Sequence, residues 1–137
     1  MKRVVIVAIC LLVFHCGSAS AAELSVTILG LQNSDGSVRI ALFNRAEQFP
    51  DGKAFVRQRI KAHGNGVKVL FRDLPIGDYA IAVLHDKNNS SRMDYSWLGF
   101  PQEAYAFSGR KASRKPTFKD ALFQLAEERA SITINLQ

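Results

Sequence analysis

Apolar and polar residues alternate with a period of two in several short segments, the pattern of β-strands that bury one face. The alternating segments are residues 24–29, 38–43, 55–62, 67–72 and 131–137, and segment 79–85 is apolar on both faces, as in a central strand. Turn-forming residues separate most of them. This regular spacing predicts an all-β fold, an antiparallel Greek-key β-sandwich of about seven strands of transthyretin-like or immunoglobulin-like type.

Two local predictions concern turns. Segments 24–29 and 38–43 flank Asn33-Ser34-Asp35-Gly36, a run that tolerates turn dihedrals, so they are expected to pair as an antiparallel hairpin. Tyr79 begins the central strand just after Gly77 and is expected to return its hydroxyl to the backbone upstream, the tyrosine corner of β-sandwiches.

Segment 55–62 carries a basic face. Val56 and Ile60 are expected to face the core, while the residues that alternate with them face outward: Arg57, Arg59 and Lys61. Such a row can bind phosphate or acidic glycans, or it can simply be a solvated face of the sandwich.

One stretch near the C-terminus departs from the strand pattern. Thr117 can cap a helix with Asp120 three residues later, and good helix formers follow. We predict a helical turn over 117–121 followed by a strand over 122–126. A longer helix reaching residue 128 is the alternative.

The N-terminus has the order of a secretory signal peptide. Lys2 and Arg3 precede an apolar run over residues 4–13, and small residues occupy 17–22. The apolar run is shorter than the roughly 20 residues that span a bilayer. We therefore predict a signal peptide over 1–22 with cleavage after Ala21 or Ala22, a β-sandwich domain over 23–137 without a transmembrane span, and a periplasmic or secreted location.

Charge and cysteine content narrow the function classes. The chain carries 18 basic and 12 acidic residues, and removing Lys2 and Arg3 leaves 16 against 12, a net charge of +4. This mild excess permits adhesion to anionic polymers or membrane surfaces but argues against nucleic-acid binding. Both cysteines, Cys10 and Cys16, lie in the signal, which excludes thiol chemistry and thiolate metal sites from the mature domain.

Residues 86–116 show no clear strand period and are predicted to form a long loop. Loops beyond about 15 residues in compact domains are usually functional or disordered, and the aromatic content of this one opposes disorder. Its aromatic side chains either pack on the sandwich or form a binding surface. The candidate binding residues are His85, Asp86, Trp97, Phe100, Tyr105 and Phe107.

The start of this loop resembles a calcium-binding loop. Oxygen-bearing side chains occupy positions 1, 3, 5 and 9 of that pattern: Asp86, Asn88, Ser90 and Asp94. Ser91 stands where the pattern has a glycine, and Trp97 stands where a bidentate glutamate would close the site. We expect a weak calcium site or a turn held by its own side-chain hydrogen bonds, and we expect no other cofactor.

A hydrolase that uses His85, Asp86 and Asp94 is the enzymatic alternative. No Gly-x-Ser-x-Gly motif is present, and adjacent residues of a strand point to opposite faces, so Asp86 is not expected to orient His85. The sequence supplies these residues without a catalytic spacing.

Several motifs together resemble the bacterial family called domain of unknown function number 2141. They are Leu42-Phe43-Asn44, Phe49-Pro50, the run from Phe71 to Val83, His85-Asp86-x-Asn88, Asp94, Leu98-Gly99-Phe100-Pro101, Phe107-Ser108 and the run from Pro116 to Ala121. The Asp-Leu-Pro-x-Gly-x-Tyr part is shared with prealbumin-like and carboxypeptidase-regulatory-like sandwiches. The resemblance implies an exported β-sandwich of unassigned activity whose loop looks able to hold a metal, although Ser90 and Ser91 stand where the family favours Asn and Gly.

The sequence thus favours an exported, non-catalytic binding or envelope accessory module that acts through its long loop. Its partner is expected to be an envelope protein, a glycan or a small ligand, and not a nucleic acid. A hydrolase and a weak calcium-binding module remain the alternatives.

Overall fold

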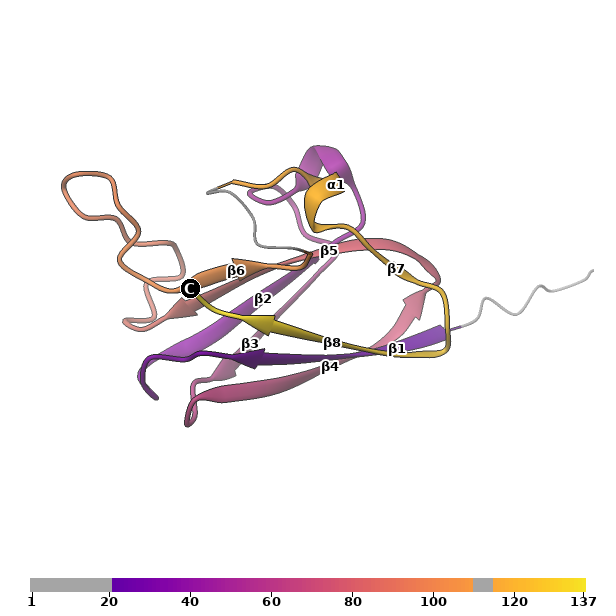
Figure 1. Cartoon of the computed structure of the whole chain (residues 1–137), viewed down its shortest axis with the longest axis horizontal. Helices are drawn as coiled ribbons and strands as arrows, with labels where there is room; N and C mark the ends of the chain where they lie inside the picture. Colours follow the sequence, from indigo (N-terminus) through magenta and orange to yellow (C-terminus); the bar gives the residue numbers. More distant parts are fainter. Residues whose placement is uncertain (1–20, 110–114) are drawn as a thin grey trace, which may run out of the picture.

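The computed structural model describes residues 21–109 and 115–137 and consists of two β-sheets with a long loop at one end (Figure 1). One sheet has the strand order β4-β1-β8; the other has the order β3-β2-β5-β6, with β7 also pairing with β5. The strands are β1 (Ala21–Leu29), β2 (Ser37–Phe43), β3 (Val56–Lys61), β4 (Gly66–Pro75), β5 (Gly77–Asp86), β6 (Tyr105–Phe107), β7 (Phe123–Leu125) and β8 (Arg129–Asn135). A 3-10 turn, η1 (Ala46–Gln48), and a short helix, α1 (Phe118–Ala121), complete the described elements.

The period-two pattern places the core where the sequence predicts it. Alternate residues of β1, β2 and β5 are buried and form one apolar cluster between the sheets, which includes Leu24, Val26, Ile28, Val38, Ile40, Leu42, Ile81 and Val83. The predicted all-β sandwich is therefore confirmed. In the part of the chain that the structure describes, no helix is long and apolar enough to cross a membrane.

The predicted hairpin between the first two strands is wrong. β1 pairs with β4 and β8 in one sheet, whereas β2 pairs with β3 and β5 in the other. The turn at 33–36 therefore connects the two sheets. β1 and β2 pack their apolar faces against the opposite sheet, and each strand is hydrogen-bonded on both edges to strands other than the one predicted. One of these pairings, β1 with β8, is parallel, which the expectation of an antiparallel sandwich did not include.

The long segment 86–116 contains one strand that the sequence did not reveal. β6 is three residues long, too short to show a period, and it pairs with β5 from Ala82↔Phe107 to Leu84↔Tyr105. This pairing makes β5 a central strand, as its two apolar faces predict.

The helical turn predicted from Thr117 is confirmed. The Thr117 side chain accepts a hydrogen bond from the backbone N–H of Asp120, whose carboxylate accepts one from the Thr117 backbone, a complete capping box. The predicted strand over 122–126 is present as β7, paired with the start of β5, so the alternative of a helix to residue 128 is wrong. Pairing with an exposed strand edge outweighs the local helix propensity here.

Tyr79 forms the predicted hydrogen bond to the upstream backbone. Its hydroxyl donates to the carbonyl oxygen of Pro75 at 2.7 Å, and the residue is 2% exposed. Burial raises the pKa of this hydroxyl. The hydrogen bond fixes the short connection through which the chain passes from β4 to β5.

Motifs that lie far apart in the sequence meet around Phe49. Its ring lies edge-on to the rings of Phe43, Phe107 and Phe118, with centroids 5.3, 5.7 and 6.1 Å away. Beside this cluster, the Ser108 hydroxyl joins β5 to α1. The Phe49-Pro50, Phe107-Ser108 and 116–121 motifs therefore pack together beside the larger sheet.

Most of the predicted signal peptide, residues 1–20, lies outside the described residues. Its last two residues, Ala21 and Ala22, begin β1, opposite Pro75 and Leu74, and Ala22 is fully buried.

Candidate functional site

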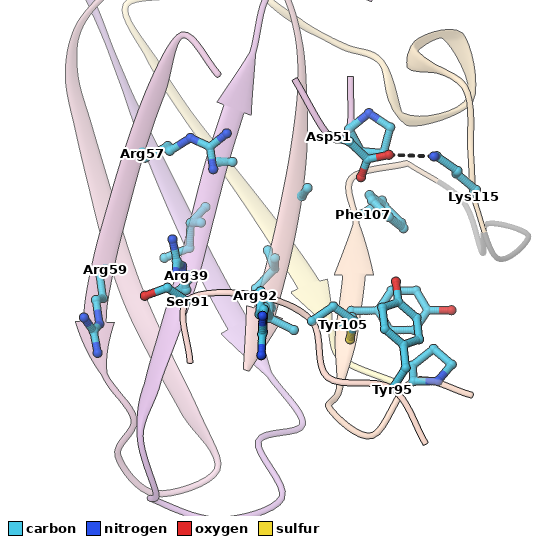
Figure 2. Close-up of a pocket in the computed structure, with 18 of the residues that line it drawn as sticks. Arg39, Asp51, Arg57, Arg59, Ser91, Arg92, Tyr95, Tyr105, Phe107 and Lys115 are labelled. Atoms are coloured by element: carbon cyan, nitrogen blue, oxygen red, sulfur yellow. Dashed lines mark ion pairs between the residues drawn. The ribbon is translucent and has the colours of Figure 1, made fainter. Parts of the chain in front are cut away.

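A pocket of about 730 Å³ lies on the outer face of the five-stranded sheet (Figure 2). Its floor comes from β3, β2, β5 and β6, and the loop between β5 and β6 forms one wall. The principal lining residues are Arg39, Ala41, Arg57, Arg59, Ala82 and Leu84 from the floor strands, Arg92, Met93, Tyr95 and Phe100 from the loop, Tyr105 and Phe107 from β6, and Asp51 and Lys115 at one end.

Strand register builds this floor from two parallel rows of side chains. One row runs Arg57, Ala41, Ala82, Phe107, and the other runs Arg59, Arg39, Leu84, Tyr105. Paired residues in a sheet project to the same face, so each row runs from an arginine on β3 to an aromatic ring on β6. The pocket is therefore basic at one side and aromatic at the other, as Figure 2 shows.

Small side chains in the middle of the sheet leave room for a ligand. Ala41 and Ala82 occupy the centre of one row, where larger side chains would fill the space below the loop. Both alanines and Leu84 are only half-buried although they lie on central strands. The middle of the floor is thus an apolar surface that the loop does not cover completely.

The arginines are incompletely neutralised. Arg57 donates to the carbonyl oxygen of Gly52 at 2.8 Å, and Arg59 donates to the uncharged side chains of Ser37 and Asn89 at 2.9 and 2.6 Å. Within the described ranges, neither has a carboxylate at ion-pair distance.

Arg39 lies directly opposite Arg59 in the β2–β3 register. Its Nη1 atom is 3.7 Å from the buried carboxylate of Asp86, and this nitrogen is itself buried without a hydrogen-bond acceptor among residues 21–109 and 115–137. Like charges directly opposite each other destabilise a sheet, and the Asp86 carboxylate lies at ion-pair distance from Arg39 but, among the described residues, not from Arg59. An anion between the two guanidinium groups would reduce this repulsion.

The far end of the pocket has a different character. Tyr105 and Phe107 lie edge-to-face with centroids 5.9 Å apart, and Tyr95 from the loop faces them in Figure 2. Lys115 and Asp51 form an ion pair of 2.6 Å beside these rings. The hydrogen bond and charge of Asp51 raise the pKa of Lys115, and the pair brings no net charge to this end.

The predicted binding residues divide into two groups. Phe100, Tyr105 and Phe107 line the pocket. His85, Asp86 and Trp97 do not. Trp97 is 92% exposed at the end of the loop, away from the pocket lining.

His85 and Asp86 point to opposite faces of β5, as expected for neighbours in a strand. His85 is buried between the sheets, where its Nε2 lies 2.9 Å from the carbonyl oxygen of Asp35. Asp86 lies on the outer face under Arg39. The structure therefore does not bring His85, Asp86 and Asp94 into one cleft as the hydrolase alternative would need.

The turn after Asp86 is held by side-chain hydrogen bonds. The two oxygens of Asp86 accept the backbone N–H groups of Ser90 and Ser91, each at 2.8 Å, and Asn88 donates to Asp94. These bonds are the self-stabilised turn that the sequence offers as one interpretation. The described residues include no group of three or more His, Cys, Asp or Glu side chains that could hold a metal; weak calcium binding stays a prediction.

The sequence indicates only part of the pocket. Arg57 and Arg59 are on the outward face that the alternation predicts, but Arg39, Arg92 and Lys115 belong to distant segments. The signal for Arg39 is its outward position in the period of β2. Its placement opposite Arg59 depends on the register of the β2–β3 pairing, which the sequence does not indicate.

A comparison with protein-family models matches residues 26–133 to DUF2141, a family of uncharacterized proteins conserved in bacteria. The match covers most of the chain, and the chain belongs to this family. No curated protein and no solved structure matches the chain.

Proposed function

We propose that this DUF2141 protein is an exported, non-catalytic binding module, and that its pocket takes a small anionic ligand with an apolar or aromatic body. The observation that carries the proposal is the pair of arginines, Arg39 and Arg59, held directly opposite each other on the pocket floor. The two like charges destabilise the sheet when no ligand is bound. A bound oxyanion would reduce their repulsion and accept hydrogen bonds from both guanidinium groups.

The chemistry of the guanidinium groups favours a phosphate or carboxylate. A guanidinium presents several N–H donors in one plane and matches the oxygens of these anions in pairs. Arg57 lies one row away, on the same side of the pocket. Three cationic side chains at one side of a partly enclosed cavity concentrate positive potential there.

The aromatic side selects the rest of the ligand. Tyr105 and Phe107 end the two rows that begin with arginines, and planar or apolar groups pack well on such rings. The pocket volume of about 730 Å³ is within the range of small-molecule sites. A phosphorylated or carboxylated compound with a ring or short apolar part, an acidic sugar among them, fits both sides.

Export is supported by the charged, apolar and small-residue order of the first 22 residues. The burial of Ala22 in β1 favours cleavage after Ala21 over cleavage after Ala22. N-terminal sequencing of the protein from the envelope fraction tests this. A chain that still begins at Met1 in the soluble periplasm would contradict it.

Calorimetric titration with phenyl phosphate tests the binding proposal, with inorganic phosphate and phenol titrated separately to measure each half of the ligand. We expect phenyl phosphate to bind more tightly than either half. Arg59→Gln should weaken it about tenfold or more, since hydrogen bonds to charged groups contribute about 1.5 to 3 kcal/mol.

Lys61→Gln is the matched control. Lys61 follows on the same outward face of β3 and carries the same charge, but it does not line the pocket. It should leave the affinity unchanged. Equal weakening by both substitutions, or no binding of any anion, would refute the site, and release of phenol during the titration would refute the non-catalytic assignment.

A further inference from the structure

The end of the long loop is a protruding apolar surface. Residues 95–101, here called the loop tip, lie in the loop between β5 and β6, which extends beyond the sandwich (Figure 1). Trp97 is 92% exposed, Leu98 61% and Phe100 52%. The loop tip contains no ionisable acid or base other than the Tyr95 hydroxyl. Large apolar side chains that cluster on a protrusion mark an interaction site.

Three backbone N–H groups of the loop tip are hydrogen-bonded within the tip itself. The Ser96 N–H donates to the carbonyl oxygen of Phe100 at 2.8 Å, and the Gly99 N–H donates to that of Ser96 at 2.9 Å. The Phe100 N–H donates to the Ser96 hydroxyl at 3.2 Å. Backbone groups that are paired internally can leave water at low cost, which an apolar surrounding requires.

The charges beside the loop tip favour an anionic surface. Of the acidic residues that flank it, Glu103 is buried and accepts the N–H of Lys87 at 2.9 Å, and Asp94 is held by Asn88. The Arg92 side chain is 83% exposed, and its Nε lies 3.9 Å from the Asp94 carboxylate. The acidic groups at the base of the loop are therefore buried or paired, and the net charge of +4 that remains without Lys2 and Arg3 is left to attract an anionic surface.

We propose that the loop tip inserts Trp97 and Leu98 into the interfacial layer of a membrane that carries anionic lipids. Tryptophan favours this layer, and the net positive charge of the domain is attracted to its negative surface. A convex tip with two leading side chains offers far less area than the roughly 800 Å² per partner that a stable protein interface needs. A fluid bilayer can surround such a tip without a matching groove.

This inference does not depend on the ligand pocket. Trp97 and Leu98 do not line it, so variants at these positions test the membrane contact alone. Trp97 is the only tryptophan of the chain, and its fluorescence therefore reports on the loop tip without labelling.

The experiment measures the tryptophan emission and co-sedimentation of the protein with vesicles of phosphatidylglycerol and phosphatidylethanolamine. We expect the Trp97 emission to shift to shorter wavelength and to be quenched by lipids brominated on their acyl chains. Leu98→Asp should reduce the bound fraction about tenfold or more, because the carboxylate would have to enter the interface.

Ile76→Asp is the matched control. Ile76 is 43% exposed and precedes β5, whereas the loop follows β5, so it lies at the opposite end of this strand and receives the same change of charge. It should bind as the unmodified protein does. Unchanged Trp97 emission with vesicles, or equal losses for both variants, would overturn the proposal, as would a Trp97 contact found only with an envelope protein.

Discussion

Ser108 makes two buried hydrogen bonds that tie the central strand to α1, and its removal should destabilise the protein strongly. The hydroxyl accepts the N–H of Ile81 at 2.7 Å and donates to the carbonyl oxygen of Ala121 at 2.6 Å. Ser108 is 1% exposed. Ser108→Ala would leave one donor and one acceptor of the backbone buried without partners.

The expected loss follows from these two groups. Each unsatisfied buried group costs about 1 to 3 kcal/mol, partly offset because the alanine no longer buries a hydroxyl. We expect Ser108→Ala to lower the free energy of unfolding by about 2 to 4 kcal/mol. The separate bond from the Ser108 N–H to Ile81 at 2.9 Å should keep the local strand pairing.

Ser25→Ala is the matched control, because the Ser25 hydroxyl is buried without a hydrogen-bond partner in the described part of the chain. Its removal should be neutral or slightly stabilising. Urea unfolding followed by circular dichroism measures both; the exposed Trp97 is a poor reporter of unfolding. Equal midpoints for Ser108→Ala and the unmodified protein, or a larger loss for Ser25→Ala, would refute the reasoning.

Three further predictions concern other described residues. Tyr79→Phe should lower the free energy of unfolding by about 1 kcal/mol, since it removes the hydrogen bond to Pro75 without opening a cavity; an unchanged urea midpoint would contradict it. Hydrogen bonds from Thr117 lower the pKa of Asp120, so the capping box should stabilise the fold above the unfolded pKa of about 3.9 and lose that effect as the pH falls through the lowered value; a stability gap between the unmodified protein and Asp120→Asn that does not narrow in acid would count against this. Calcium should bind with a dissociation constant no better than about 10⁻⁴ to 10⁻³ M. Calorimetry that finds micromolar binding, abolished by Asp86→Ala, would show instead that the turn after Asp86 is a calcium site.

The strands, the capping box and the tyrosine hydrogen bond could be predicted because each depends on neighbours in the sequence. Alternation fixes which face of a strand is buried, and Thr117 and Asp120 are three residues apart. The partner of each strand depends on non-local burial. The turn at 33–36 has the residues of a hairpin, yet it connects two sheets.

The candidate site was harder to predict for the same reason. The outward direction of Arg57 and Arg59 follows from period two, but nothing local indicates that Arg39 lies opposite Arg59. The sequence predicts that the aromatic residues of the long loop either bind a ligand or pack on the sandwich. Phe107 does both, contacting Phe49 and lining the pocket, whereas Trp97 is left exposed.

Chemical-shift mapping by NMR during a titration with phenyl phosphate tests the central claim, that the arginine rows and the β6 rings form one ligand site. We expect saturable shifts of the Arg39, Arg57 and Arg59 side-chain N–H signals together with the ring signals of Tyr105. Shifts confined to other surfaces, or arginine shifts that inorganic phosphate reproduces in full while the Tyr105 ring stays unchanged, would contradict it.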